Sequence, residues 1–117
     1  MSSLATDPRR PATLYAGTPR GVAVSRDRGA HWQRILREPR GIETVAVDPH
    51  RPGTIWAGGK RVWRSRDVGR TWKPLDRTGP GAFSTVTGLE ADPRNPCRLV
   101  ACTQGGGLLE IRISPGS

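Results

Sequence analysis

The sequence predicts an all-β protein, and three observations carry that prediction. Short segments rich in β-branched and aromatic residues end at clusters of Asp, Gly and Pro, which is how strands and turns alternate in all-β proteins. No stretch of about a dozen residues shows the 3.6-residue apolar period of an amphipathic helix. Two motifs also recur together with a period of about 41 residues, which indicates a repeat architecture.

The first repeated motif opens with Asp-Pro and runs into an apolar segment. It covers residues 7–17 and returns over residues 48–58, with seven of the eleven positions identical. A more divergent third copy covers residues 92–102. Each copy therefore predicts a turn that leads into a strand.

The second motif has the form Ser-x-Asp-x-Gly-x-x-Trp and occurs at residues 25–32 and 65–72. An Asp side chain can accept hydrogen bonds from nearby backbone N–H groups and hold a turn, while Gly supplies a positive φ. We expect the Trp to cover the hairpin as a large apolar plug, and we expect the motif to be structural. The residues concerned are Ser25, Asp27, Gly29, Trp32, Ser65, Asp67, Gly69, Thr71 and Trp72.

Each repeat unit also contains four predicted strands. In the second unit they are residues 42–47, 54–57, 61–65 and 72–75. Four strands in about 40 residues make one blade of a β-propeller. We therefore predict a partial β-propeller of about 2.75 four-stranded blades of about 41 residues, with these hairpins inside the blades. The segment is 1–117, with a first blade at about 3–38, a second at about 42–78 and an incomplete third at about 83–113.

The second motif resembles the Asp box, also called the bacterial neuraminidase (BNR) repeat, and the Asp-Pro segments are similar to the inner half of such blades. Similar repeats occur in sialidases, sortilin-type receptors, xyloglucanases and photosystem II assembly factors. The resemblance covers about residues 4–113. It implies a sialidase-like or WD40/YVTN-like propeller with structural Asp boxes away from the active-site face. It implies no single function, because those families include enzymes, receptors and assembly factors.

The sequence shows no cofactor or metal pattern. The Asp of each hairpin motif lacks the second nearby acid of a calcium loop, and no helix follows the glycines of residues 104–107 to bind phosphate. Cys97 and Cys102 lie five positions apart on a predicted strand, so we expect reduced, partly buried thiols without an internal disulfide. His31 and His50 are not spaced as zinc ligands. We therefore expect no catalytic residue, cofactor or metal ion.

The charge balance favours acidic partners. The chain has 19 Lys and Arg against 10 Asp and Glu, a net charge of +9, which attracts anionic molecules over long range. The Arg residues are scattered over predicted turns and strands, which argues against nucleic acid as the partner. We expect a basic binding rim at the turns between second and third strands, with Arg20, Lys60 and Arg61. Such a rim suits an acidic protein or glycan.

The number of blades and the termini add further expectations. No apolar run is long enough to span a membrane, and no signal-peptide pattern precedes the repeats, so a cytoplasmic location is the default expectation. Propellers close with about four to eight blades. The chain is therefore expected to be a piece of a longer propeller, one part of a split propeller, or a protomer of a homo-oligomer, in which two copies would complete one ring.

We expect a non-catalytic propeller module that serves as a protein- or glycan-binding scaffold, or a fragment of a longer propeller. The alternative is part of a sialidase-like glycoside hydrolase whose catalytic residues lie mostly outside this chain. Sialidases use a Tyr nucleophile, but Tyr15 is replaced by Trp56 in the next repeat and is expected to pack inside a blade. Glu43, Glu90 and Glu110 remain as candidates for paired-carboxylate hydrolysis only by elimination.

Overall fold

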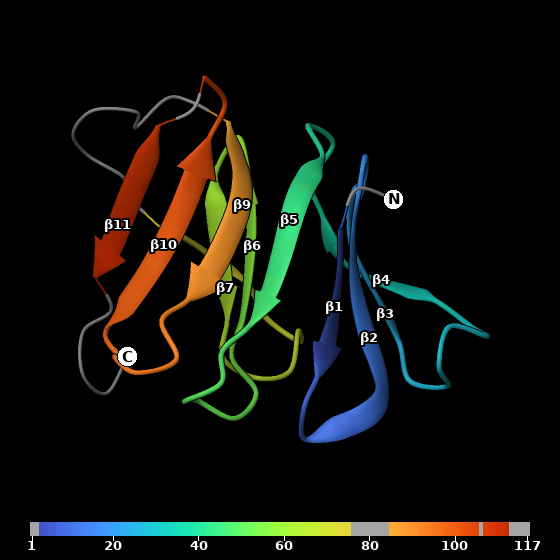
Figure 1. The fold of residues 1–117 in the computed structure, drawn as a ribbon. Helices are drawn as coiled ribbons and strands as arrows, with labels where there is room; N and C mark the ends of the chain where they lie inside the picture. Colours follow the sequence, from blue (N-terminus) through green and yellow to red (C-terminus); the bar gives the residue numbers. More distant parts are fainter. Residues whose placement is uncertain (1–2, 76–84, 106, 113–117) are drawn as a thin grey trace.

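The computed structural model describes residues 3–75, 85–105 and 107–112. This part of the chain contains eleven strands and no helix, so the all-β prediction is confirmed. The strands form three antiparallel sheets that follow one another along the chain (Figure 1). Predicted strand or blade boundaries that fall at 76–84 or at 113 lie outside the described residues.

The three sheets repeat one topology, in which strands adjacent in sequence are adjacent in space. The first sheet contains β1 (Ser3–Asp7), β2 (Arg10–Thr18), β3 (Gly21–Ser25) and β4 (Gln33–Arg37). The second contains β5 (Ile42–Val47), β6 (Ile55–Gly59), β7 (Val62–Ser65) and β8 (Lys73–Leu75). The third contains β9 (Val86–Ala91), β10 (Arg98–Thr103) and β11 (Leu108–Arg112).

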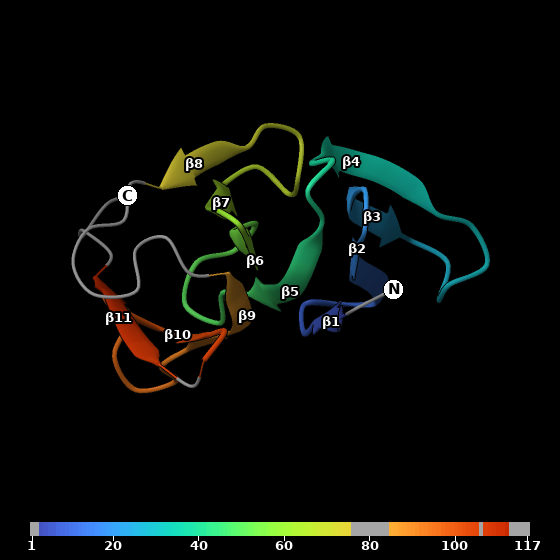
Figure 2. The ribbon, with the colours of Figure 1, turned by 90° about the horizontal axis from the view of Figure 1, so that it is seen from above.

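The sheets stand next to one another with their first strands together. β5 lies between β1 and β9, whereas β4 and β8 lie on the outer side of the array (Figure 2). Side chains alternate between the two faces of a strand. Among the described residues, the second sheet therefore presents one face to the first sheet and the other face to the third.

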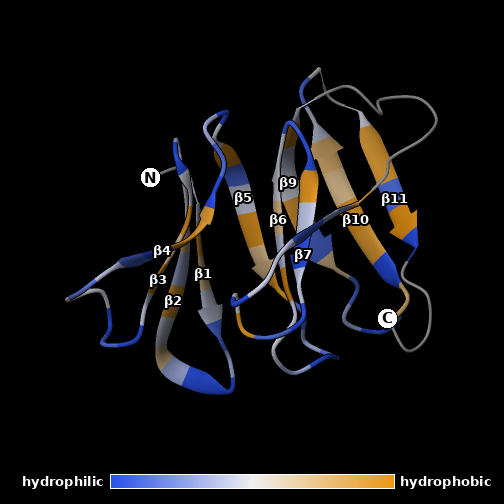
Figure 3. Cartoon of the chain, turned by 180° about the vertical axis from the view of Figure 1, so that it is seen from behind, coloured by the Kyte–Doolittle hydropathy of each residue, from blue (hydrophilic) through white to orange (hydrophobic). Residues whose placement is uncertain are grey.

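The apolar core lies between the sheets rather than within any one of them. Between the first two sheets, Tyr15 and Val22 pack against Ile42, Val45 and Ile55, and none of the five is more than 5% exposed. Apolar surface buried in this way contributes about 25 cal/mol per Å² to folding. Apolar residues are accordingly found along the strands and polar ones in the turns (Figure 3).

The contact between the second and third sheets repeats that arrangement. Trp56 and Val62 of the second sheet belong to one cluster with Val86, Leu99 and Ala101 of the third. Trp56 holds the repeat position that Tyr15 holds in the first sheet. One position of the repeat thus supplies a large buried aromatic ring to each contact between sheets.

Glycine is required where the first strand of the next sheet approaches most closely. A Cβ on Gly58 would lie 2.7 Å from Val86 Cγ1, and one on Gly17 would lie 3.0 Å from the Ile42 carbonyl oxygen. Gly17 and Gly58 occupy the same repeat position. The repeated Ala-Gly dipeptide therefore reflects contact between neighbouring sheets as well as the turn that follows it.

The two Ser-x-Asp-x-Gly-x-x-Trp hairpins differ in what surrounds them. The second packs on the first sheet, because Trp72 and Ile35 both flank the core between these sheets. A Cβ on Gly69 would lie 2.5 Å from Ile35 Cδ1. The first hairpin has no preceding sheet in the described residues. A Cβ on Gly29 would meet nothing closer than 3.8 Å, and Trp32 is 40% exposed.

We predict that Gly69→Ala destabilises the chain more than Gly29→Ala. Both glycines have positive φ, so a side chain at either position costs about 1–2 kcal/mol. Only the change at Gly69 also forces the Ile35 side chain to move. Denaturant unfolding of the two variants beside the parent measures the difference, and equal losses of stability would contradict the packing of this hairpin on β4.

Candidate functional site

The first Ser-x-Asp-x-Gly hairpin is held by a closed set of hydrogen bonds. The Ser25 hydroxyl donates to Asp27 Oδ1 at 2.8 Å and accepts from the Gly29 N–H at 2.7 Å. Asp27 Oδ1 also accepts from the backbone N–H of His31 at 2.8 Å. The Trp32 indole N–H donates to the Gly29 carbonyl at 3.0 Å. The carboxylate is therefore engaged within its own turn.

The second hairpin repeats these bonds. The Ser65 hydroxyl donates to Asp67 Oδ1 at 2.8 Å and accepts from the Gly69 N–H at 2.8 Å. The backbone N–H of Thr71 donates to Oδ1 at 2.8 Å, and its hydroxyl donates to Oδ2 at 2.5 Å. The Trp72 indole N–H donates to the Gly69 carbonyl at 3.0 Å.

The backbone of each hairpin contains one feature that sequence reasoning missed. Gly29 and Gly69 have φ of 96° and 88°, in line with expectation. The residues just before them, Arg28 and Val68, also have positive φ, at 60° and 62°, although neither type favours that region. The Arg28 N–H donates to the carbonyl of Ala12 in β2, and the Val68 N–H donates to the carbonyl of Gly53 in the connection between β5 and β6. That contact holds the unusual conformation in place.

The hydrogen bonds lower the pKa of both hairpin carboxyls from 3.8 to about 2. At Asp27 the main cause is the bond from the His31 backbone N–H. At Asp67 it is the bond from the Thr71 hydroxyl. A carboxyl with so low a pKa is ionised at neutral pH and holds no proton to donate as a general acid.

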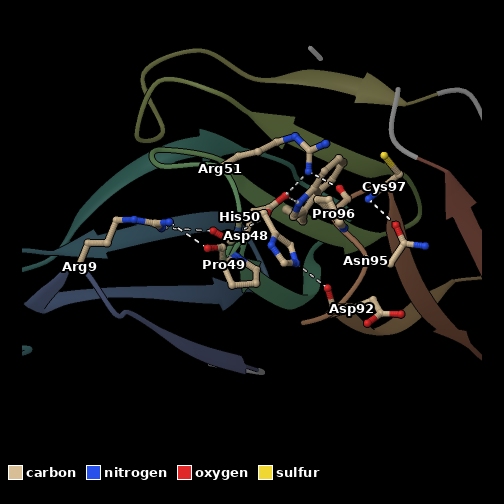
Figure 4. A network of polar contacts seen from close by, with 10 residues as sticks. Arg9, Asp48, Pro49, His50, Arg51, Asp92, Asn95, Pro96 and Cys97 are labelled. Atoms are coloured by element: carbon tan, nitrogen blue, oxygen red, sulfur yellow. Dashed lines mark hydrogen bonds and ion pairs between the residues drawn. The ribbon is translucent and has the colours of Figure 1, made fainter. Parts of the chain in front are cut away.

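The Asp-Pro turns at the lower end of the sheets in Figure 1 join neighbouring sheets to one another (Figure 4). The Arg9 guanidinium donates to the carbonyl of Pro49 at 2.9 Å and of Asp48 at 3.5 Å. In the next repeat, His50 Nε2 lies 2.7 Å from the Asp92 carbonyl oxygen. Arg9 and His50 hold the same repeat position. One position thus supplies a donor from each sheet to the turn of the following sheet.

A buried carboxylate organises the middle turn. Asp48 is 1% exposed and accepts from the His50 backbone N–H at 2.8 Å, from Arg51 Nη1 at 3.4 Å and from Trp56 Nε1 at 3.4 Å. The Arg51 guanidinium also donates to the Pro96 carbonyl of the third sheet. Hydrogen bonds and an opposite charge together offset the cost of burying this carboxylate.

The predicted rim residues lie at the opposite end of the sheets, the upper end in Figure 1. Arg20 lies in the turn between β2 and β3, and Lys60 and Arg61 lie between β6 and β7. All three are exposed. Gly105 follows β10 at the same end, while Gly106 lies outside the described residues.

A groove of about 340 Å³ at this end brings only one of the three rim residues together with other polar groups. Lys60 lines it, whereas the Arg61 guanidinium lies over the ring of Trp63, 6.0 Å from its centroid. Arg40, which sequence reasoning missed, also lines the groove from the connection between β4 and β5. The other lining residues are Gly41, Glu43, Gly59, Thr85, Thr87 and Gln104.

Arg40 is positioned by a buried carboxylate. The Glu38 side chain is 4% exposed, and its two oxygens accept from Arg40 Nε at 3.1 Å and Nη2 at 3.0 Å. The Glu38 N–H donates to the Arg20 carbonyl at 2.9 Å, which ties this connection to the turn between β2 and β3. The hydrogen bond from Arg40 lowers the pKa of Glu38. The Arg40 side chain remains 54% exposed and can contact a ligand.

The groove combines two cations, hydroxyls, an amide and one carboxylate. This set can hold a carboxylate ligand by charge and can hydrogen-bond the groups around it. No three His, Cys, Asp or Glu side chains of the described segments gather as metal ligands.

The three candidate carboxylates for hydrolysis do not all lie at one site. Glu43 lines the groove just described, whereas Glu90 lines a separate groove on the third sheet. Glu110 forms ion pairs with Arg98 at 3.0 Å and with Arg112 at 3.3 Å on that sheet. Glu90 and Glu110 are both register partners of Val100 and lie on the same face of the third sheet, whereas Glu43 lines the other groove.

The two cysteines are free, as expected, but they differ in exposure. Cys97 precedes β10 and is half-buried, while Cys102 lies in β10 and is exposed. The expectation of partial burial is thus wrong for Cys102. Its side chain lies on the face of the third sheet that no other sheet covers in the described residues.

Within the same residues, no helix is long and apolar enough to cross a membrane.

Comparison with known proteins finds similarity in structure only. No protein-family model and no curated protein matches the chain. The GH74 xyloglucanase from Xanthomonas campestris matches with a TM-score of 0.72 and 21% identity, over 92% of this chain and 20% of that one. YCF48 from Cyanidioschyzon merolae matches with a TM-score of 0.69 and 20% identity, over 94% of this chain and 36% of that one. YCF48 bound to a D1 peptide matches with a TM-score of 0.65 and 16% identity, over 99% of this chain and 36% of that one.

These matches show that the chain has the fold of part of a β-propeller, as predicted. The chain spans 20% of the xyloglucanase and 36% of each YCF48 chain. At these identities the likeness concerns the fold, and a fold of this kind carries many functions.

We predict that acid weakens the fold partly through the hairpin carboxyls. The pKa of Asp67 in the folded chain is about 2, below its ordinary 3.8, so the unfolded chain takes up the proton first. The contribution of Asp67 to stability is therefore complete above pH 3.8 and is lost as pH falls towards 2. Asp67→Asn should be less stable than the parent at pH 7 and should lose less stability across this window.

Thermal unfolding between pH 2 and pH 7 measures both effects. Thr71→Ala removes one of the bonds to Asp67 and keeps the carboxyl, so its pH dependence should lie between those of the parent and Asp67→Asn. Parallel pH profiles for Asp67→Asn and the parent would count against the stabilising role of this carboxylate.

Proposed function

We propose that this chain is a non-catalytic β-propeller module that binds an acidic segment of a partner protein. The observation that carries the proposal is that Arg40 and Lys60 line one groove at the upper end of the sheets. The net charge of +9 attracts anionic partners and speeds their association. The groove then supplies the local contacts that hold a carboxylate.

Preorganisation of Arg40 supports this role. The Glu38 carboxylate fixes the guanidinium in place, so less side-chain entropy is lost when a ligand binds. Thr85, Thr87 and Gln104 line the same groove and offer hydrogen bonds to the backbone of a bound segment. Glu43 repels an anion at one side of the groove and thereby limits where a carboxylate can bind.

Known structures of this fold support a peptide as the ligand class. YCF48, which matches nearly the whole of this chain, has been solved bound to a D1 peptide. A glycan that carries carboxylates offers the same charge to the groove and is the second ligand class to test.

We also propose that the Ser-x-Asp-x-Gly-x-x-Trp hairpins are structural Asp boxes of the sialidase-like kind. Their internally paired carboxylates support this assignment. The lower-end turns and the hairpins then hold the sheets together, and binding is left to the loops at the upper end.

The module further requires additional blades. Three sheets are fewer than the four to eight blades with which propellers close. We propose that it works within a closed ring completed by a second copy of the chain or by further propeller sequence.

Binding of a fluorescein-labelled peptide of alternating Glu and Gly, followed by fluorescence anisotropy, tests the groove. Lys60→Glu should weaken binding about tenfold or more at low salt, and added salt should weaken binding by the parent. Lys73→Glu, on β8 outside the groove, changes the chain's only other lysine in the same way and should leave affinity nearly unchanged. Equal affinities for these two variants would exclude this groove. An oligogalacturonate probe tests the glycan.

A second candidate function, part of a glycoside hydrolase, is favoured by the likeness to the GH74 xyloglucanase. Such hydrolysis uses two carboxyls about 5–9.5 Å apart, and Glu43 and Glu90 lie in separate grooves. We therefore expect the purified chain to release no reducing sugar from xyloglucan and no fluorophore from a sialoside. Release that is lost in Glu43→Gln would favour the hydrolase.

A further inference from the structure

The two outermost faces of the array expose apolar residues. Among the described residues, Leu4 is 56% exposed, Trp32 40% and Leu108 75%. Leu4 and Trp32 lie on the side of the first sheet that points away from the second, here termed the leading face. Leu108 lies on the side of the third sheet that points away from the second, here termed the trailing face.

The leading face repeats the positions through which the second sheet packs on the first. Val45 corresponds to Leu4 in the repeat and is only 5% exposed, within the core between the sheets. Trp72 corresponds to Trp32 and packs against the same core. Both exposed residues therefore stand where the repeat buries an apolar side chain against a preceding sheet.

The trailing face repeats the positions that receive a following sheet. Val22 and Val62 correspond to Leu108, and both are fully buried. A groove of about 470 Å³ is lined by Val100 and Cys102 on this face, and it extends past β9 to Thr44 of the second sheet. Cys102 holds the repeat position of the two glycines against which β5 and β9 lie. The groove thus coincides with the place that the first strand of a following sheet would occupy.

A polar contact is repeated in the same way. Arg94 holds the position from which Arg9 and His50 reach the Asp-Pro turn of the following sheet. It is exposed, and no sheet follows it in the described residues. The Asp-Pro turn at residues 7–8 of the first sheet offers the matching carbonyl groups, and no described sheet precedes it.

We propose that the trailing face of one copy of this chain binds the leading face of a second copy, so that two copies close a ring through two head-to-tail contacts. The inference rests on the closed ring proposed above and identifies what completes it. A second copy is the occupant because its leading face carries the complement of the trailing face. β1 fills the groove, Leu4 and Trp32 become covered, and Arg94 meets the first Asp-Pro turn.

Two residues make this contact weaker than the contacts inside the chain. Cys102 stands where the other sheets have Gly, and Glu90 stands where they have Ala. The thiol keeps β1 of the second copy farther away, and the Glu90 carboxylate loses water on contact. Changing either residue back to that of the other repeats should therefore strengthen the association.

Light scattering after size exclusion, with circular dichroism to verify folding, tests the proposal. The parent chain should give a mass near twice 12.7 kDa at high concentration. Leu4→Asp and Leu108→Asp should each shift it to the monomer. A mixture of the two should regain dimer, because each variant keeps the face that the other has lost. Gln33→Asp, an exposed position on β4, makes the same change of charge away from the faces and should stay dimeric.

Three further variants separate a specific contact from general stickiness. Glu90→Ala should lower the dimer dissociation constant about tenfold, while Glu43→Ala at the upper end should not change it. Arg94→Ala should raise that constant, and it alters an exposed turn residue whose loss leaves the core intact. In the dimer, the Cys102 thiol should react more slowly with a maleimide than in Leu4→Asp.

A folded parent monomer at high concentration overturns the inference, as does a mixture of the two Asp variants that stays monomeric. A dimer that Leu4→Asp breaks and Leu108→Asp leaves intact overturns it as well, because it points to contact between two leading faces. A monomer that still binds the acidic peptide through Lys60 removes the inference and leaves the proposed binding function standing. A head-to-tail dimer that does not bind the peptide supports the inference and contradicts the proposed binding function.

Discussion

Face-to-face packing of sheets is the constraint on which the rest of this structure depends. A single four-stranded sheet has two apolar faces and cannot cover either by itself, so each repeat is stable only beside another. Tyr15 and Trp56 show this most directly, since one repeat position supplies the ring buried in each contact. The glycines at the ends of β2 and β6 belong to the same constraint, because they let the next sheet approach closely.

Polar contacts give this packing its order. Apolar faces alone would permit several offsets between neighbouring sheets. Arg9 and His50 each reach a carbonyl of the following turn, and buried Asp48 binds the guanidinium that reaches the third sheet. These bonds form at only one offset, so they fix the relative position of the sheets and explain why charged residues recur in turns far from the groove that Arg40 and Lys60 line.

The two ends of the sheets differ in what their polar groups contact, and this difference follows from the packing of the sheets. The Asp-Pro turns hydrogen-bond to one another and the hairpins hydrogen-bond internally, whereas Arg40 and Lys60 line a groove at the upper end. Arg40 is exposed because Glu38 is buried beneath it, and the sheets that fix Glu38 thereby fix the groove. Loops on a rigid β scaffold are a common place for binding sites. Within the described residues, the two outer faces of the array are the other consequence, since three sheets in a row have two faces without a neighbouring sheet.

The strands, the turns and the repeat could be predicted from the sequence, because they depend on local chemistry: β-branched segments, Asp-Pro turns and positive-φ glycines at a fixed period. Tertiary structure decided what those residues meet. Trp32 and Trp72 share one motif but differ in their surroundings, because in the part of the chain that the structure describes a sheet precedes the second hairpin and none precedes the first. Arg40 belongs to no sequence motif, and its position in the groove depends on the hydrogen bond to buried Glu38, two residues earlier. Which side chains become buried, and which come together in a groove, depends on the neighbouring sheets, and a local sequence pattern does not contain that information.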